Sequence, residues 1–212
     1  SSDLPISTYS QNKEVTTSGR GDDCGYHSLA IGILGYAQQN PAKVISAFNE
    51  IGFNVGGLTG EISKDQLSLG QAIKQYFIGN HHKTTWIDNQ LKELKLEDSG
   101  LKKEIRNSLE APSFISADYL NFMAHKLGFS VRLNGAEEQV EGDNIRIFNK
   151  NSVHYTGTMP ADVVDTYKTL LDQFETKIIT EANNQLGRLR SCYELEEPRS
   201  MFTFLPGFVT AY

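Results

Sequence analysis

The chain has 212 residues, a formal net charge of −6, and 39% hydrophobic and 22% charged residues. These values are typical of a globular protein with a sizeable core, and the negative charge argues against a nucleic-acid partner, because phosphate binding needs a basic surface. No apolar run is long enough for a membrane segment. The two cysteines cannot form a disulfide framework, so a reducing compartment is expected.

The first predicted helix spans residues 25–38 and follows a polar stretch, residues 1–20, predicted to be an extended arm. Its apolar run begins at Leu29, and Cys24 lies at its N-terminus. At that position the unpaired backbone N–H groups and the helix dipole favour a thiolate. The same N–H groups can hold an oxyanion.

Residues 39–110 are predicted to form an all-helical block within a single domain, residues 1–212. The expected segments are a helix from Pro41 to Ile51 after the N-cap Asn40, a glycine-rich loop over 52–60, a helix beginning at the capping-box pair Ser63 and Gln66, and a helix over 85–110 interrupted near Ser99.

Three short strands are predicted next, at residues 131–133, 145–148 and 153–155, because apolar and polar residues alternate there. A long amphipathic helix over 161–189 follows, which we expect to pack on the sheet rather than to bind a partner. The apolar tail at 201–208 is expected to dock on the core. The fold class is therefore α+β, with a small central β-sheet flanked by helices.

A cysteine early in the chain and a histidine late in it, His154 in the third predicted strand, have the order found in papain-type thiol hydrolases. Taken singly, each residue has a plainer interpretation: a lone cysteine is usually a small buried hydrophobe, and a strand histidine is usually a packed or exposed side chain. The pattern of loop, thiol, helix start and strand histidine favours the catalytic interpretation.

The segment Gly21–Ser28 and the pair His154-Tyr155 resemble the ovarian-tumour (OTU) family of cysteine deubiquitinases. In that family an aromatic, a basic and a small residue follow the residue after the cysteine, as Tyr26, His27 and Ser28 do here. The helix and strand expected within residues 115–133 resemble the unit that precedes the family's histidine.

The resemblance implies a papain-like OTU fold in which residues 39–110 form an inserted helical lobe. It also implies a thiol-dependent ubiquitin hydrolase with ubiquitin or polyubiquitin chains as its partner. A monomer without a cofactor is expected. Bacterial effector versions of the family have a large helical insert, so the resemblance further implies an effector that acts in the host cytoplasm. The start of the chain, which is not a methionine, suggests a domain of a longer protein.

The resemblance assigns Cys24 as the nucleophile, His154 as the general base, and backbone N–H groups near Asp23 and Cys24 as the oxyanion donors. The family's acidic residue usually lies three positions before the cysteine, where this chain has Gly21. A loop shorter by one residue would align Asp22 with that acid, so Asp22 is predicted to orient His154.

Two asparagines, Asn149 and Asn151, are the alternatives for orienting the histidine. Two residues beyond His154, where the family often has an acid or an asparagine, this chain has Thr156. Two other functions stay open: a thiol protease for another ubiquitin-like protein or for peptides, and a catalytically inactive ubiquitin-binding module.

The remaining histidines and the second cysteine have weaker functional patterns. No zinc signature or phosphate-binding glycine loop occurs, so no metal is expected. The residues concerned are His27, expected to pack the cysteine helix, His81 and His82, expected in a solvated loop, His125, expected to be structural, and Cys192, which has no base nearby in the sequence.

Overall fold

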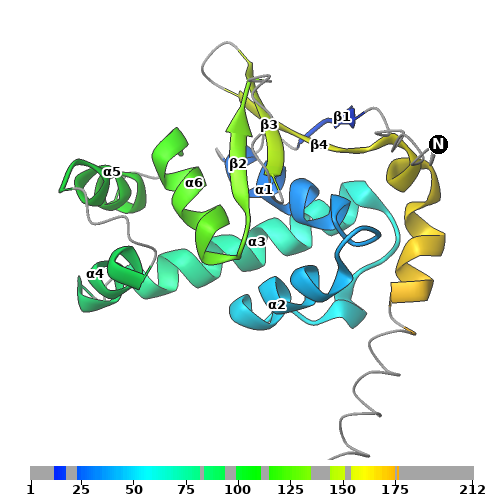
Figure 1. The fold of residues 1–212 in the computed structure, drawn as a ribbon, viewed down its shortest axis with the longest axis horizontal. Helices are drawn as coiled ribbons and strands as arrows, with labels where there is room; N and C mark the ends of the chain where they lie inside the picture. Colours follow the sequence, from blue (N-terminus) through cyan, green and yellow to red (C-terminus); the bar gives the residue numbers. More distant parts are fainter. Residues whose placement is uncertain are drawn as a thin grey trace, which may run out of the picture. The chain divides into compact units, whose positions relative to one another are not determined.

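The computed structural model describes residues 12–17, 23–81, 84–93, 99–110, 115–134, 144–150, 154–174 and 176. The chain divides into two compact units, residues 1–175 and 176–212. The fold described below is that of the first unit (Figure 1).

Helices and a small sheet make up this unit, so the predicted mixed α+β class is confirmed. The elements in chain order are β1 (Asn12–Val15), α1 (Cys24–Gly35), α2 (Pro41–Ile51), the 3-10 turn η2 (Val55–Gly57), α3 (Ile62–His81), α4 (Thr84–Glu93), α5 (Ser99–Glu110), α6 (Ala117–Lys126), β2 (Ser130–Leu133), β3 (Asn144–Lys150) and β4 (His154–Pro160). A helix over 161–174 follows β4.

The sheet has the strand order β1-β4-β3-β2. β4 pairs antiparallel with β1 and with β3, and β2 pairs parallel with β3. All three predicted strands are present, although the third runs from His154 to Pro160 and not from 153 to 155. The extended arm contributes a fourth strand, β1, whose mostly exposed polar residues gave no alternating pattern.

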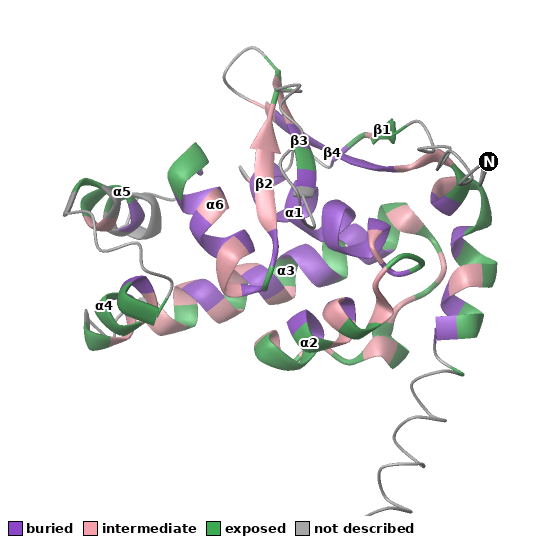
Figure 2. Ribbon diagram, viewed as in Figure 1, coloured by how far each residue is buried: buried purple, intermediate pink, exposed green. Residues whose placement is uncertain are grey.

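Helix α1 is the centre of the unit, because all twelve of its residues are buried (Figure 2). A helix that is apolar on every side needs neighbours all around it, and α1 packs against β3, β4, α3 and α6. The approach of β3 depends on Gly32, where an added Cβ would lie 2.0 Å from Cγ2 of Ile145.

Two further glycines let neighbouring elements approach α1 closely. A Cβ on Gly157 of β4 would lie 2.8 Å from the carbonyl oxygen of Ser28, and a Cβ on Gly70 of α3 would lie 2.5 Å from Cδ2 of His27. Because α3 packs on α1, the block 39–110 contains a helix of the core. That this block is an inserted lobe stays a prediction.

Helix α2 begins and ends as predicted, because both of its ends are capped. The side chain of Asn40 accepts a hydrogen bond from the Lys43 N–H, Pro41 is at the first helical position, and Gly52 ends the helix with φ 69°.

The capping box predicted for the next helix is wrong, because α3 begins at Ile62 and Ser63 lies inside it. The start of α3 is held instead by Asp65, a fully buried carboxylate. Its Oδ1 accepts hydrogen bonds from the N–H and the hydroxyl of Thr59, both at 2.7 Å. Its Oδ2 accepts from the Gly60 N–H at 3.1 Å and from the Tyr167 hydroxyl at 3.0 Å.

The long helical stretch predicted over 85–110 is divided into α4 and α5, in line with the interruption expected near Ser99. The helix predicted over 161–189 is helical at 161–174. Residue 176 is helical as well, and the rest of the predicted helix, the tail at 201–208 and Cys192 lie outside the described residues. Within the described residues, no helix is long and apolar enough to cross a membrane.

A glycine-to-alanine pair tests how tightly α1 is enclosed. Gly32→Ala should destabilise the protein by about 1–3 kcal/mol, because Ile145 is a stiff, β-branched side chain that cannot move aside. Gly79→Ala on α3, where an added Cβ meets nothing within 4 Å, should instead stabilise by up to about 1 kcal/mol. Urea unfolding of both variants measures the difference. Equal effects would mean that α1 is packed less tightly than described.

Candidate active site

Cys24 is the first residue of α1, and its side chain is only 5% exposed. Its Sγ accepts a hydrogen bond from the backbone N–H of Tyr155, with 3.5 Å between N and Sγ. The thiol therefore lies at the start of β4, beside the residue that follows His154. The fold thus places the predicted nucleophile against the backbone of the residue that follows the predicted base; that the two side chains act together stays a prediction.

Gly25, the residue after the cysteine, is required by the packing of Ile115. An added Cβ on Gly25 would lie 2.8 Å from Cδ1 of Ile115. The carbonyl of Ile115 accepts a hydrogen bond at 2.9 Å from the Tyr155 hydroxyl. Burial raises the pKa of Tyr155 to about 12, and the neighbouring Cys24 contributes to the increase, so this hydroxyl keeps its proton and its hydrogen bond at neutral pH.

The partner of His154 is Thr17, a residue that the sequence did not suggest. The Nε2 of His154 lies 3.1 Å from the Thr17 hydroxyl oxygen, and that hydroxyl donates to the Tyr155 carbonyl at 2.6 Å. A hydroxyl has one proton, so Thr17 must accept from an Nε2–H of His154. The neutral ring then has its lone pair on Nδ1, which is therefore the nitrogen that can accept a proton.

Thr17 is 4% exposed and is held from two sides. It follows β1, whose pairing with β4 sets Val15 opposite Gly157 and carries the chain towards Tyr155. The preceding residue, Thr16, accepts a hydrogen bond at 3.2 Å through its carbonyl from the side chain of Gln66 on α3. No sequence signal marks Thr17, because its position depends on the pairing of a polar edge strand.

Of the predicted orienting residues, Asn149 is excluded by the strand register. Lys150 is opposite His154 and Asn149 is opposite Tyr155, so the side chains of Asn149 and His154 lie on opposite faces of the sheet. The Oδ1 of Asn149 is buried and has no hydrogen-bond partner among the described residues. The other two candidates, Asp22 and Asn151, lie outside the described residues.

A carboxylate and an ammonium group lie on the sheet beside the histidine. Lys150 is opposite His154 in β3, and its Nζ lies 2.5 Å from Oε1 of Glu14. The same oxygen accepts a hydrogen bond from the Thr156 hydroxyl at 2.7 Å. Lys150 and Thr156 lower the pKa of Glu14, with a smaller contribution from His154, so its carboxylate stays ionised beside the imidazole.

Asp23, the residue before the cysteine, is the N-cap of α1 but does not cap it. Within the described part of the chain, its side chain makes no capping hydrogen bond. Its Oδ1 is 2.6 Å from the Nζ of Lys74 on α3. The first helical hydrogen bond runs from the His27 N–H to the Asp23 carbonyl at 3.0 Å. The earlier N–H groups, including those of Asp23 and Cys24, are therefore not used by the helix itself.

The other histidines are placed as follows. His27 is buried against Gly70, and His125 is half-buried in α6. His81 is the last residue of α3 and not part of the predicted loop, and His82 lies outside the described residues. The described residues contain no group of three or more His, Cys, Asp or Glu that could hold a metal ion.

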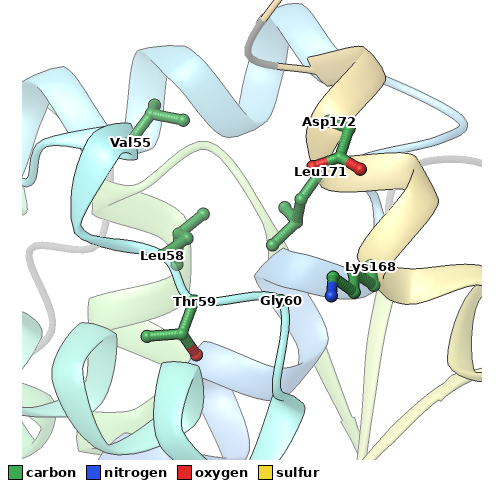
Figure 3. A pocket seen from close by; sticks show the side chains of 7 residues that line it. All are labelled: Val55, Leu58, Thr59, Gly60, Lys168, Leu171 and Asp172. Atoms are coloured by element: carbon green, nitrogen blue, oxygen red, sulfur yellow. The ribbon is translucent and has the colours of Figure 1, made fainter.

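A small pocket of about 70 Å³ lies between the loop before α3 and the helix over 161–174 (Figure 3). Leu58 and Leu171 give it an apolar wall, and Lys168 and Asp172 lie on its helical side. Cys24 and His154 are not among its lining residues, so the pocket is distinct from the candidate active site.

No family model, curated protein or solved structure matches the chain.

The hydrogen bond between Thr17 and His154 predicts a defined tautomer. At a pH where the ring is neutral, ¹⁵N NMR should show an Nε2–H form of His154 whose ring proton exchanges slowly with water, because Thr17 is buried and accepts that proton. Thr17→Val, which removes the acceptor and keeps the shape, should accelerate this exchange. Thr16→Val is the matched control, since the Thr16 side chain is exposed. An unchanged exchange rate in Thr17→Val would show that another group holds the ring.

Proposed function

We propose that this chain is a cysteine isopeptidase of the OTU type that removes ubiquitin from proteins or trims ubiquitin chains. The observation that carries the proposal is the contact between the Cys24 thiol and the start of β4, together with the lone pair that His154 keeps on Nδ1 because Thr17 binds its Nε2–H. The resemblance around Cys24 and His154 supplies the substrate class. Ubiquitin or polyubiquitin is thus the proposed partner.

In the proposed reaction the Nδ1 of His154 takes the proton of the Cys24 thiol, and Sγ attacks the carbonyl carbon of the isopeptide bond. Backbone N–H groups of Asp23 and Cys24 stabilise the oxyanion, a contribution of about 3 kcal/mol for one donor. The imidazolium then gives its proton to the departing lysine amine, which leaves a thioester. His154 next takes a proton from water as the water oxygen attacks the thioester, the carboxylic acid is released with Cys24 as the thiolate, and the imidazolium returns its proton to the sulfur.

Thr17 differs from the acid that often orients such a histidine, because its hydroxyl carries no charge. It can fix the tautomer of His154, but it cannot stabilise the imidazolium by a full negative charge. Glu14 supplies a negative charge in this neighbourhood, although Lys150 offsets much of it. We therefore expect the orientation of the ring, more than an ion pair, to determine its efficiency as a base.

A nucleophile at the start of a buried helix and a base on an adjacent strand are also the plan of the papain-like OTU fold, which we propose for this chain. A monomer is proposed, with the host cytoplasm as its place of action if the parent protein is a bacterial effector. These last proposals depend on the resemblance alone.

The burial of Cys24 favours one alternative, an inactive ubiquitin-binding module. A nucleophile that is 5% exposed must become accessible before it can attack. If substrate binding does not uncover it, the chain can bind ubiquitin without cleaving it. A covalent ubiquitin probe separates the two functions, because only an assembled and accessible site reacts.

Ubiquitin with a thiol-reactive C-terminus should attach to Cys24. We expect intact-mass spectrometry to show the addition of one ubiquitin to the wild type and none to Cys24→Ala. His154→Ala should label at least about a hundredfold more slowly, because the general base is lost. Cys192→Ala is the matched control and should label as the wild type does, since the chain has only these two cysteines.

The linkage specificity can be read from a panel of all di-ubiquitin dimers. Cleavage by the wild type and by neither Cys24→Ala nor His154→Ala would support the isopeptidase. Binding of ubiquitin without labelling or cleavage would support the inactive module. Absence of binding, labelling and cleavage would leave the protease for another substrate as the better proposal.

The Thr17 hydroxyl should matter for catalysis more than for substrate binding. We expect Thr17→Val to lower kcat by about ten- to a hundredfold with little change in KM, because the base stays present but is no longer held in its productive orientation. Steady-state kinetics on the best di-ubiquitin measure the split, and Thr16→Val should behave as the wild type. A change in KM alone would contradict an orienting role.

A further inference from the structure

Asp23 immediately precedes the candidate nucleophile, and its conformation is unusual for a residue that begins a helix. Aspartate is among the best N-cap residues, and such residues normally adopt the β region, with ψ between roughly +100° and +180°, so that the side chain accepts from the second or third helical N–H. Asp23 has φ −87° and ψ 5°. Within the described residues its carboxylate makes no capping hydrogen bond.

The carboxylate of Asp23 is held by Lys74 of the neighbouring helix α3. The Nζ of Lys74 lies 2.6 Å from Oδ1, and the side chains of Lys74 and Asp23 are only 30% and 18% exposed. A partly desolvated ion pair is stronger than one on the open surface. The pair is therefore able to compete with a capping interaction that stabilises a helix by about 1 kcal/mol.

We propose that Lys74 is a positioning residue that keeps the N-terminus of α1 uncapped and open to an oxyanion. The proposal rests on the proposed function, because it concerns the oxyanion donors of the same reaction. Its physical basis is the competition for one carboxylate between an ammonium group on α3 and the N–H groups of Gly25 and Tyr26 at the start of α1.

Release of the carboxylate would change the site in two ways. The Asp23 carbonyl is fixed by the His27 N–H, so a change of ψ to the β region would redirect the N–H of Asp23 together with its side chain. One predicted oxyanion donor would thus turn away. In addition, a negative charge would lie over the first turn of α1, where it would repel both a Cys24 thiolate and the oxyanion.

The test compares Lys74→Met with a variant that also lacks the carboxylate. Lys74→Met keeps the length of the side chain but frees Asp23, so kcat for di-ubiquitin should fall by about tenfold or more. Lys74→Met combined with Asp23→Ala should recover most of that loss, because alanine does not cap a helix. Lys74→Arg, which retains a cation, should stay close to the wild type.

Lys64→Met is the matched control. Lys64 is also on α3 and also forms an ion pair, with Glu61 at 2.8 Å, but both side chains are more than half exposed. The variant should leave kcat unchanged. A loss of activity in Lys64→Met equal to that in Lys74→Met would show that the effect is one of α3 stability and would overturn the proposal.

A second readout does not depend on ubiquitin. In Lys74→Met, amide hydrogen exchange at Gly25 and Tyr26 should slow by about fivefold, because a released Asp23 would then accept from these N–H groups. The double variant should exchange at the wild-type rate. If the wild type cleaves no ubiquitin chain, the proposed function fails while this measurement still decides the role of Lys74. Unchanged exchange in Lys74→Met, or a double variant as impaired as the single one, would overturn the proposal.

Discussion

The enclosure of α1 on every side is the constraint on which the rest of the unit depends. A twelve-residue helix without a polar face cannot lie on a surface, so the sheet and helices α3 and α6 must surround it. Glycines at the contacts bring these neighbours within reach of the helix backbone, as Gly32 and Gly157 do on the side of the sheet. Because protein interiors are close-packed, small changes at these contacts shift whole elements.

The same enclosure explains how Cys24 and the start of β4, which are far apart in the sequence, come into contact. Cys24 is at the start of α1, and β4 is in contact with that helix through Gly157. His154 is the first residue of β4, three residues before Gly157. The backbone N–H of the next residue, Tyr155, contacts the Cys24 thiol at the start of α1. The positions of both residues therefore follow from core packing, and the loop around the cysteine needs only to complete the site.

Sequence patterns predicted the elements whose signals are local. Helix α2 has its start marked by Asn40 and Pro41 and its end by Gly52, and the observed bounds agree with the prediction. The capping box at Ser63 failed, because α3 begins at Ile62 and its first hydrogen bonds run to the Glu61 carbonyl. The buried Asp65 is satisfied in part by Tyr167, 102 residues away, and that contact has no local signature.

The candidate site shows the same division between local and long-range information. The thiol at a helix start and the histidine in a strand could be found from the order of residues alone. Thr17 could not, because its role arises from an edge strand of polar residues that pairs with β4 and from a hydrogen bond donated to the preceding residue by Gln66. Asn149 was a reasonable candidate by its distance in sequence, but the alternation of a strand turns it to the other face.

Asp23 illustrates a conflict between local preference and the folded structure. By its residue type it should cap α1, yet the structure gives its carboxylate to Lys74. In a sequence selected only for stability, local and tertiary preferences agree, and their disagreement tends to mark places where function sets the requirement. A capping Asp23 would turn its own N–H, one of the proposed oxyanion donors, away from the site and would add negative charge over the first turn of α1. The helix gives up a capping interaction of about 1 kcal/mol at the point where the proposed reaction needs that donor and no added negative charge.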